Sequence, residues 1–229
     1  MSVPTELLPD PLPQHPLGVA LRWLDDAWAL RAQPNPNSMV LATVSADGSP
    51  SARVVLCKAI VPEPGYVVFY TNYRSRKGRE LASNSRAAAV MHWDQLHRQV
   101  RIEGTVVLSP PAESDAYFET RPWQSRLGAW ASAQSEPIDS RKALADALAG
   151  AAGRFGVPLP SQANESLQPA ARIPRPAHWG GYRIYAQTVE LWVEGEARIH
   201  DRARWSRALT VRSDGDCVAG PWTVTRLQP

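Results

Sequence analysis

Short segments rich in β-forming residues recur along most of this chain, and this pattern constrains its fold more than any other feature. The clearest segment spans residues 98–109, where apolar and polar residues alternate as a half-buried strand requires. The apolar face would carry Val100, Ile102, Val106 and Leu108, and the polar face would carry Gln99, Arg101, Glu103 and Thr105. We therefore expect one face to be packed and the other to be wet or to line a site.

Further β segments follow one another at short intervals, separated by turn residues. Asp47 and Gly48 supply a tight turn between the first two, which predicts a hairpin. The strands expected besides 98–109 span residues 39–45, 52–60, 65–71, 87–93, 181–186, 188–193, 197–205 and 222–227. Strands in this meander-like order favour an antiparallel barrel, mainly β with helices added outside.

Helical patterns lie before and between the β segments. Apolar residues at helical spacing predict an amphipathic helix over residues 16–32. Ser75 is placed to cap a short helix that ends near Asn84. The remaining helices are expected from Pro110, over residues 123–133, and from Ser140 with an apolar stripe of Leu144, Leu148, Ala151 and Phe155.

The composition favours one compact domain with appendages. The chain has 229 residues, of which 44% are hydrophobic and 21% charged, and this is enough for one substantial core. We expect a proline-rich, mobile arm over residues 1–15 and a single domain over residues 16–229. Within that domain, residues 157–177 are too rich in proline and polar residues for a regular element and are expected to form a long surface loop.

The charges and cysteines exclude several classes of protein. The net charge is +3 with a pI near 9.1, but the charges are scattered, which suits small phosphorylated ligands better than a nucleic acid. Cys57 and Cys217 have the spacing of neither a disulfide framework nor a metal site, so we expect reduced thiols in the cytoplasm. The N terminus does not resemble a signal peptide, and no apolar run approaches the roughly 20 residues of a membrane helix.

Cations and hydroxyls gather in residues 53–77 in a pattern that suits a phosphate. Arg53 and Lys58 lie on an expected strand, and Ser75, Arg76 and Lys77 begin a helix, whose first amides attract anions. The helix cations could equally be the solvated face of a surface helix. Because Arg53 and Lys58 are an odd number of positions apart, a regular strand points them to opposite faces. A shared site would need a bulge; otherwise the two serve different ligands.

A second cluster consists of Tyr117, Arg121 and Ser125. These residues are spaced by four and share one helical face if the helix survives Pro122. A break at that proline would place Ser125 on the following turn. The alternative is a helix that packs Tyr117 into the core and leaves Arg121 in solvent.

A third cluster follows Trp192 near the end of the chain. Arg198, His200 and Arg202 occupy alternate positions of an expected strand and would share a face. Such a row of cations is stable beside an anion or an electron-rich ring, although a wet, exposed strand would also tolerate it.

Six segments that include these clusters resemble the pyridoxamine 5'-phosphate oxidase family. They are RVVLCK at 53–58, FYTNYRSRKGRE at 69–80, RQVRIEG at 98–104, YFETRPWQSRLGAWASAQS at 117–135, WGGYR at 179–183 and RIHDR at 198–202. The resemblance runs from about residue 14 to the C-terminal RLQP, in the family's order. It implies an FMN-binding split β-barrel, a Greek-key-like antiparallel barrel with peripheral helices, which works as a homodimer with FMN at the interface.

The resemblance also implies roles for individual residues. The FMN ligands would be Arg53, Tyr70, Thr71, Ser75, Arg76, Lys77, Gln99, Gln134, Ser135, Trp192 and Arg202. The substrate would be pyridoxamine or pyridoxine 5'-phosphate, with its phosphate held by Lys58, Tyr117, Arg121 and Ser125 and its ring under Arg198 and His200. The last two residues would be catalytic, with Arg198 orienting or polarising the reacting group. Oxygen would accept the electrons and yield hydrogen peroxide.

The chain departs from the family's pattern in a few places. Ile199 replaces a commoner leucine, and Cys57 stands where an aliphatic residue is usual. Residues 1–15 lack the Arg-Arg-x-Tyr segment that covers the substrate in some members, so a lid is missing or made otherwise. Residues 157–177 and 210–220 look longer than usual and are expected to be surface excursions without a catalytic role.

Three other functions stay open at this point. A related split-barrel flavin oxidase could act on another reduced ring, as in phenazine pathways, but Lys58, Tyr117 and Arg121 favour the vitamin B6 substrate. A non-catalytic carrier of flavin or pyridoxal phosphate could keep both phosphate sites. A nucleic-acid binder would need a basic stripe that the sequence does not contain.

Overall fold

The computed structural model describes residues 6–160, 171–212 and 216–229. Parts of the expected arm (1–5), of the expected surface loop (161–170) and of the expected excursion (213–215) lie outside the described residues. The chain forms two compact units. The sheet unit comprises Met1–Phe69, Glu80–Leu108 and Tyr182–Pro229, and the helical unit comprises Tyr70–Arg79 and Ser109–Gly181. That both belong to one domain over residues 16–229 stays a prediction.

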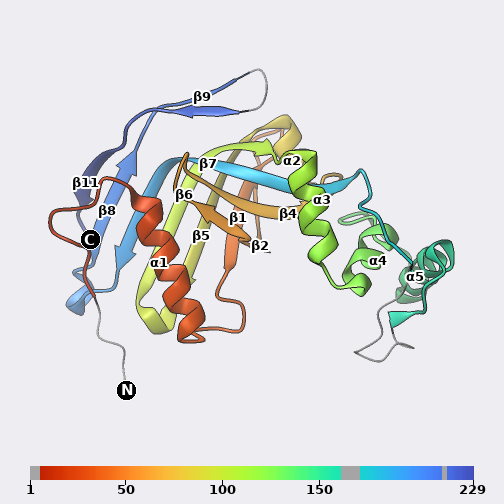
Figure 1. Cartoon of the computed structure of the whole chain (residues 1–229). Coiled ribbons are helices and arrows are strands. Elements are labelled where there is room, and N and C mark those ends of the chain that lie inside the picture. The colour runs from red at the N-terminus through yellow and green to blue at the C-terminus, as the bar shows by residue number, and fades with distance from the viewer. Residues whose placement is uncertain (1–5, 161–170, 213–215) are drawn as a thin grey trace. The chain divides into compact units, whose positions relative to one another are not determined.

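A nine-stranded sheet dominates the fold, which confirms the prediction of a mainly β protein (Figure 1). Seven strands follow one another in the order β11-β8-β7-β6-β5-β1-β2, while β3 pairs with β4 and β4 also pairs with β7. The strands are β1 (Ser38–Val44), β2 (Pro50–Leu56), β3 (Ala59–Val61), β4 (Tyr66–Asn72), β5 (Arg86–Trp93), β6 (Arg98–Leu108), β7 (Trp179–Val193), β8 (Asp201–Ser206) and β11 (Thr223–Leu227). A separate hairpin joins β9 (Leu209–Val211) to β10 (Cys217–Ala219) within the expected excursion.

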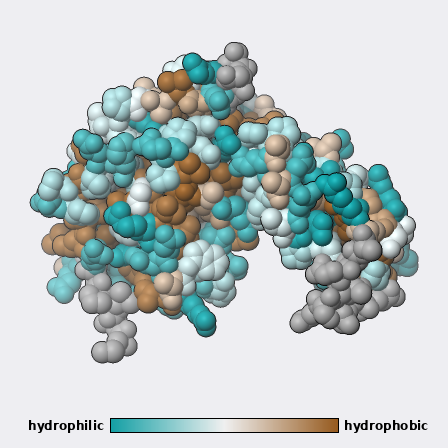
Figure 2. All heavy atoms as spheres, in the orientation of Figure 1, coloured by the Kyte–Doolittle hydropathy of each residue, from teal (hydrophilic) through white to brown (hydrophobic). Residues whose placement is uncertain are grey.

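Helix α1 (Pro16–Ala29) lies over the sheet and covers part of its core (Figure 1). It buries Leu17, Trp23 and Leu24, as the spacing of its apolar residues predicts, while hydrophilic residues cover much of the surface where it lies (Figure 2). The core beneath it includes Trp93, which is fully buried and donates its indole N–H to the carbonyl oxygen of Pro36 at 2.7 Å. A buried indole needs such a partner, so this bond fixes the ring.

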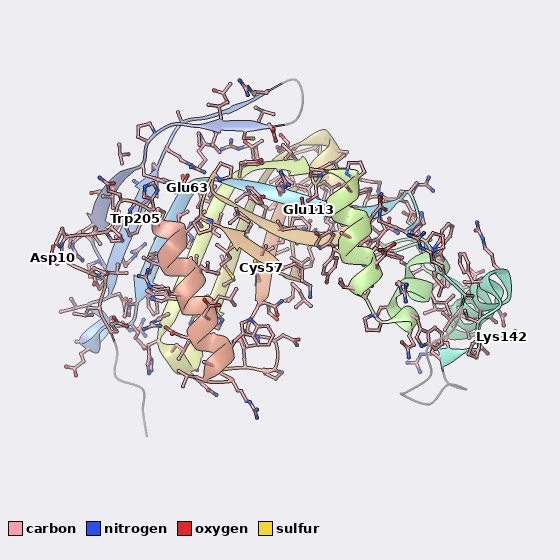
Figure 3. The ribbon with its side chains drawn as sticks, in the orientation of Figure 1. Asp10, Cys57, Glu63, Glu113, Lys142 and Trp205 are labelled. Atoms are coloured by element: carbon pink, nitrogen blue, oxygen red, sulfur yellow. The ribbon has the colours of Figure 1, made fainter. Side chains whose placement is uncertain are left out.

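The described part of the expected N-terminal arm contacts the sheet unit. Leu8 is buried, and its backbone N–H donates to Oδ2 of Asp201 at 2.8 Å. Trp205, which is labelled in Figure 3, donates its indole N–H to the carbonyl oxygen of Pro13 at 2.8 Å. These bonds connect the arm to β8; that the arm is mobile stays a prediction.

The helical unit is built from α3 (Pro111–Thr120), α4 (Trp123–Ala131) and α5 (Arg141–Phe155). Glu113 on α3 and Lys142 on α5 are labelled in Figure 3. Ser140 caps α5 as expected, because its hydroxyl accepts the backbone N–H of Ala143 at 3.0 Å. The small core of this unit consists of Trp123, Leu127, Ala151, Ala152, Val157 and Ile173.

Two expectations about this unit need correction. Leu144 does not belong to a buried stripe, because it is 46% exposed. Val157 and Ile173, at the two ends of the expected surface loop, are buried in the core. The apolar residues in these proline-rich ends therefore pack against α4, although the composition of the loop indicates a solvated segment.

Three strand predictions also change. Residues 52–60 are not one strand, because β2 ends at Leu56 and β3 begins at Ala59. Residues 181–186 and 188–193 form a single strand, β7. Leu108, the last residue of β6, is 59% exposed, whereas Val100, Ile102 and Val106 are buried as predicted. The register shift between Glu103 and Gly104 places an extra residue, Gln187, on β7 and leaves the alternation of β6 intact. None of the helices in the described part of the chain has the length and apolar character of a membrane span.

Candidate functional site

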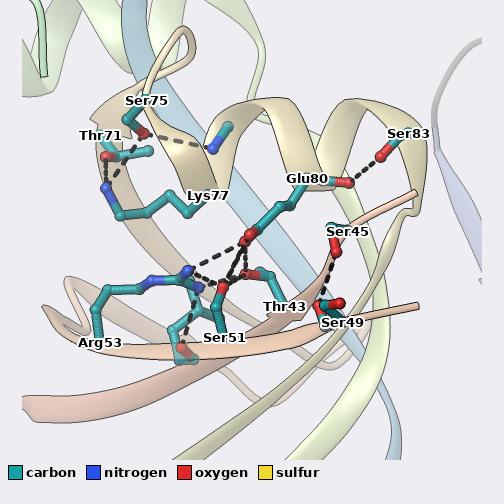
Figure 4. Close-up of polar contacts among 12 residues, drawn as sticks. Thr43, Ser45, Ser49, Ser51, Arg53, Thr71, Ser75, Lys77, Glu80 and Ser83 are labelled. Atoms are coloured by element: carbon teal, nitrogen blue, oxygen red, sulfur yellow. Dashed lines mark hydrogen bonds and ion pairs between the residues drawn. The ribbon is translucent and has the colours of Figure 1, made fainter. Parts of the chain in front are cut away.

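A buried lysine lies at the start of α2 (Arg76–Ser83), within the helical unit. The Nζ atom of Lys77 is 3.0 Å from Oγ1 of Thr71 and 3.2 Å from Oγ of Ser75 (Figure 4). It is also 3.2 Å from Oε1 of Gln134. The Ser75 hydroxyl also accepts the backbone N–H of Gly78 at 3.4 Å, so Ser75 caps the helix as predicted. We call Thr71, Ser75, Lys77 and Gln134 the lysine cluster.

The lysine cluster has the chemistry of a phosphate site. A cation and two hydroxyls lie at a helix N terminus, where the helix dipole adds a partial positive charge. Three of its members come from the predicted FMN ligands in residues 70–77, and the fourth, Gln134, comes from a distant segment. Of the other predicted ligands nearby in sequence, Arg76 and Ser135 are exposed. The arrangement therefore fits the phosphate end of FMN.

Arg53 forms a second polar cluster, within the sheet unit. Its guanidinium donates to the carbonyl oxygen of Leu41 at 3.3 Å, to the hydroxyls of Thr43 and Ser51, and to Oε2 of Glu80 at 3.1 Å (Figure 4). The Glu80 carboxylate is 6% exposed and accepts hydrogen bonds from the same two hydroxyls. The ion pair to this buried carboxylate and the three other hydrogen bonds of the guanidinium hold the arginine in one orientation.

Lys58 lies outside both strands, in the break between β2 and β3. Its backbone N–H donates to the carbonyl oxygen of Val68 at 2.8 Å, and its side chain is exposed. The strand-face argument that separated Lys58 from Arg53 assumed one regular strand, so it does not apply. That the two cations serve different ligands stays a prediction.

An aromatic stack lies between α3 and the start of β7, within the helical unit. The rings of Tyr70 and Tyr117 are stacked with centroids 3.9 Å apart, and Trp179 is stacked on Tyr70 at 5.5 Å. The guanidinium carbon of Arg121 lies 4.6 Å from the Trp179 ring centroid and 5.5 Å from that of Phe118. The structure thus brings Tyr117 and Arg121 together through a shared contact with Trp179.

Helix α3 does not survive Pro122. Arg121 ends it in an extended conformation, with φ −73° and ψ 145°, because a proline disfavours helical geometry in the residue before it. Ser125 lies on α4 and is exposed. The condition for one shared helical face is therefore not met, and Ser125 follows the break at Pro122, as the alternative predicted.

The Arg121 side chain has an unsatisfied donor. Its Nη1 atom is buried and has no hydrogen-bond partner among the residues that the structure describes. Burial lowers the pKa of the guanidinium, because a charged group loses hydration there. A buried donor without a partner costs free energy, so this atom is suited to an anionic ligand.

Three predicted FMN ligands form a row across the sheet unit. Gln99 on β6 is opposite Trp192 on β7, which is opposite Arg202 on β8. Directly opposed residues of neighbouring strands share a face, so these side chains lie side by side. Glu190 on the same face is 8% exposed and accepts from Nε and Nη2 of Arg202 at 3.1 and 2.8 Å. A cavity of about 260 Å³ on this face is lined by residues that include Glu190 and Arg202.

The prediction that Arg198, His200 and Arg202 share a strand face is wrong. Strand β8 begins only at Asp201, and Arg198 belongs to a short 3-10 turn, Glu196–Arg198, with a φ of 65°. The chain reverses here so tightly that a Cβ on Gly195 would lie 1.7 Å from the carbonyl oxygen of Ile199. Arg198 is consequently exposed at the tip of the turn.

His200 lies against the row of predicted FMN ligands. Its ring centroid is 4.6 Å from that of Trp192, and its Nδ1 accepts the backbone N–H of Gly195 at 3.2 Å. This bond makes Nδ1 the acceptor and leaves Nε2 to carry the proton in the neutral ring. The turn therefore fixes the orientation of His200 and places Arg198 two residues before it, exposed to solvent.

Sequence reasoning missed the two buried carboxylates that hold candidate ligands, Glu80 and Glu190. It also gave no role to Trp179, although this residue begins a segment that carries the family resemblance. The signal for Glu80 was its position in the helix that begins at Arg76, one turn after Lys77. Glu190 could be found from its place two residues before Trp192, on the same face of a strand.

The comparisons with known proteins agree along nearly the whole chain. The family model described as pyridoxamine 5'-phosphate oxidase matches residues 28–153, and that described as the pyridoxine 5'-phosphate oxidase C-terminal dimerisation region matches residues 179–229. A protein of Paraburkholderia phymatum named pyridoxine/pyridoxamine 5'-phosphate oxidase is 48% identical over 94% of this chain and 89% of its own. One of the same name from Paracoccus denitrificans is 45% identical over 93% and 94%.

Solved structures give the same fold. PhzG from Burkholderia lata, in complex with tetrahydrophenazine-1-carboxylic acid, has a TM-score of 0.81 and 30% identity, with all of both chains covered. A pyridoxamine 5'-phosphate oxidase-related, FMN-binding protein from Nostoc punctiforme has a TM-score of 0.63 at 17% identity, over 93% of this chain and 96% of its own. These neighbours confirm the split β-barrel. This chain belongs to the pyridoxamine 5'-phosphate oxidase family, whose members are FMN-dependent oxidoreductases.

Proposed function

We propose that the protein oxidises pyridoxamine 5'-phosphate or pyridoxine 5'-phosphate to pyridoxal 5'-phosphate and reduces oxygen to hydrogen peroxide. The observation that carries this proposal is that the helical unit contains two separate groups of residues suited to phosphates. One is the lysine cluster around Lys77, and the other is Arg121 with its buried, unsatisfied Nη1 donor. An oxidase that binds a phosphorylated flavin and a phosphorylated vitamin at the same time needs both phosphate sites.

The lysine cluster would hold the FMN phosphate. Lys77 would supply a charge-assisted hydrogen bond to the phosphate. The hydroxyls of Thr71 and Ser75, which accept hydrogen bonds from Lys77 in this structure, would turn to donate to the phosphate when it is bound. Arg53, which Glu80 holds in one orientation, would supply a further cation. The proposed FMN ligands in full are Arg53, Tyr70, Thr71, Ser75, Arg76, Lys77, Gln99, Gln134, Ser135, Trp192 and Arg202.

The substrate phosphate would be held by Lys58, Tyr117, Arg121 and Ser125. Among these, Arg121 has the most specific support, because its Nη1 atom is buried and its N–H groups have no hydrogen-bond partner among the described residues. Anchoring the phosphate away from the reacting carbon lets binding energy fix the position of the ring. Arg198 and His200 would lie over the pyridine ring, with Arg198 orienting the reacting amine or alcohol.

FMN, when bound, supplies an acceptor for the two electrons that leave the substrate's C4' carbon, and oxygen finally takes them with two protons to form hydrogen peroxide. The amine substrate becomes an imine, which water hydrolyses to the aldehyde and ammonia. The alcohol substrate gives the aldehyde directly. His200 is positioned by its bond to Gly195 to keep a fixed tautomer beside the ring, and the Arg198 cation would stabilise negative charge on the reacting group.

We further propose a homodimer with FMN at its interface, in which some ligands come from the partner subunit. The match of residues 179–229 to a dimerisation region supports this, since the region contains Trp192 and Arg202. Val40 and Val54, which pair across β1 and β2, are 44% and 64% exposed and give the sheet an apolar surface that a partner could cover. We also propose that the enzyme works in the cytoplasm, because both cysteines are free thiols.

The test is aerobic turnover by the purified protein after loading with FMN. Pyridoxine 5'-phosphate and pyridoxamine 5'-phosphate should each yield pyridoxal 5'-phosphate with one hydrogen peroxide per product, and ammonia should appear only from the amine. The unphosphorylated vitamins should react far less, because they cannot use Arg121. Bound flavin with no turnover of any of these compounds would instead support a carrier.

A second candidate is oxidation of a reduced phenazine precursor. The fold similarity to PhzG in complex with tetrahydrophenazine-1-carboxylic acid favours it. That ligand carries a carboxylate and no phosphate, so the two candidates differ in the anion that Arg121 would bind. Offering the two kinds of substrate at equal concentration and comparing kcat/KM separates them.

A further inference from the structure

The segment Trp179-Gly180-Gly181 has no role in the proposal above, yet it lies in the stack that contains Arg121. Trp179 is 7% exposed, and its ring lies nearly parallel to those of Tyr70 and Tyr117, at 10° and 6°. Phe118 meets it edge-on, with ring centroids 5.0 Å apart. The indole is therefore held by aromatic neighbours and cannot turn without disturbing them.

The two glycines are required by the close packing of this segment. A Cβ on Gly180 would lie 2.0 Å from the Tyr73 hydroxyl, and one on Gly181 would lie 2.8 Å from Cε1 of Tyr70. The backbone of Gly181 is also bonded on both sides, because its N–H donates to Oγ of Ser114 at 3.0 Å and its carbonyl oxygen accepts from the Tyr73 hydroxyl at 3.3 Å. These contacts fix the backbone that carries the indole.

Arg121 depends on this aromatic surface for its position. Its guanidinium carbon lies 4.6 Å from the Trp179 ring centroid, within the distance at which a cation is attracted to an aromatic face. Its Nη1 atom is buried and, among the described residues, has no hydrogen-bond partner. Because no described residue hydrogen-bonds Nη1, ring contacts hold this donor in place, the shorter one with Trp179 and a longer one with Phe118 at 5.5 Å.

We propose that Trp179 is a positioning residue for the substrate phosphate. The indole ring holds the Arg121 guanidinium by a cation–π contact, so that Nη1 stays available for the anion and is not drawn into solvent. This inference rests on the proposed function, in which Arg121 binds the phosphate of the vitamin. Tyr70 and Tyr117 act through Trp179 by keeping its ring in one plane, and Phe118 supports the same ring edge-on besides its own, longer contact with Arg121 at 5.5 Å.

The test compares Trp179→Leu and Trp179→Phe with a matched control, Trp130→Leu. Trp130 also carries an arginine on its ring, with Cζ of Arg154 4.3 Å from the centroid, and it lies in the same helical unit. Trp179→Leu should raise KM for pyridoxine 5'-phosphate about 2- to 30-fold, the range of one cation–π contact. Trp179→Phe keeps a ring and should recover part of that loss.

Three further readouts separate positioning from a general structural effect. The value of kcat should stay within about twofold of the parent, because the phosphate is remote from the reacting carbon. The dissociation constant of FMN, measured by fluorescence quenching, should rise much less than KM, although Trp179 also stacks on Tyr70, one of the proposed FMN ligands. The inhibition constant of inorganic phosphate, added to the FMN-loaded enzyme, should rise in parallel with KM. Thermal unfolding of each variant checks that it is folded.

The proposal is overturned if Trp179→Leu raises KM no more than Trp130→Leu does, or if it weakens FMN binding as much as substrate binding. It is also overturned if a folded Trp179→Phe behaves like Trp179→Leu in every readout. Should the parent enzyme oxidise no phosphorylated vitamin, the proposed function fails. Calorimetric binding of inorganic phosphate to the loaded parent and variants then still decides the role of Trp179, since that measurement needs no turnover.

Discussion

Replacing Lys77 by methionine should release FMN while leaving the protein folded. The substitution keeps an unbranched apolar chain of similar length in a position that is 8% exposed, and it removes only the ammonium. Thr71 and Gln134 keep a contact with each other, since Oγ1 of Thr71 lies 3.2 Å from Oε1 of Gln134. The loss should therefore fall on the anion that the cluster binds.

The expected magnitude follows from the contacts of the ammonium. A hydrogen bond to a charged group contributes about 1.5–3 kcal/mol, so losing one to the phosphate should raise the FMN dissociation constant about 10- to 150-fold. In the flavin-free protein, the substitution removes three hydrogen bonds from the ammonium to neutral oxygens within 3.2 Å of Nζ. It also removes the free-energy cost of burying a charge, and the two effects on stability oppose each other. The melting temperature of the flavin-free protein should consequently move by no more than about 2–4 °C, which is about 1 kcal/mol at this chain length.

The assay is titration of the flavin-free protein with FMN, followed by quenching of flavin fluorescence. Arg79→Met is the control, because Arg79 lies on the same helix but is 53% exposed and pairs with Glu136 at the surface. Exposed pairs contribute about 0–1 kcal/mol, so the control should bind FMN normally. Equal affinities for Lys77→Met and the parent would refute the assignment of the lysine cluster to FMN.

Three substitutions test the division of roles, and a labelling experiment tests the burial of Cys57. Arg198→Ala should leave the yellow flavin bound and lower kcat about 100-fold, which is the effect of losing one charge-stabilising group. Arg76→Ala should instead weaken FMN retention, and equal loss of flavin in both variants would contradict this division. Glu190→Gln should loosen the hold on Arg202 and weaken FMN binding about tenfold, as one charged hydrogen bond would; unchanged flavin fluorescence titrations would show that this carboxylate is dispensable. Burial raises the pKa of the Cys57 thiol to about 12, so Cys57 of the folded protein should resist iodoacetamide near pH 8. It should react once the protein is unfolded, because the thiol then titrates at about 8.5. Rapid labelling of Cys57 in the folded protein, mapped by mass spectrometry, would show that the thiol is accessible.

Local periodicity was enough to predict the elements whose buried face is determined by the spacing of their own apolar residues. Helix α1 and strand β5 follow their apolar spacing, and Ser140 caps α5 as its residue type suggests. The failures lie where pairing with another segment decides the geometry. Strand β7 bulges opposite Gly104, where a Cβ would lie 1.9 Å from the carbonyl oxygen of Tyr185.

The turn before β8 could not be predicted for a related reason. Ala197 and Arg198 adopt positive φ, of 51° and 65°, although neither residue type favours that conformation. The reversal between β7 and β8 imposes it, and only the pairing of those strands reveals the reversal. A β-rich composition alone therefore favoured a strand through Arg198.

The candidate site was recognised from its motifs, but its internal contacts were not. The types of residue in the lysine cluster indicate a phosphate, whereas the bond from Lys77 to Gln134 joins segments far apart in the sequence. The same holds for Arg53 with Glu80 and for Arg121 with Trp179. Such contacts are products of the tertiary fold, and a single sequence contains no local signal for them.

An anaerobic titration of the FMN-loaded protein with pyridoxine 5'-phosphate tests the central claim most directly. The account predicts that the flavin absorbance is lost in proportion to the pyridoxal 5'-phosphate formed, one product per flavin, and that admitting oxygen restores the absorbance with an equal yield of peroxide. A flavin spectrum that keeps its full intensity in the presence of excess pyridoxine 5'-phosphate and pyridoxamine 5'-phosphate would contradict it.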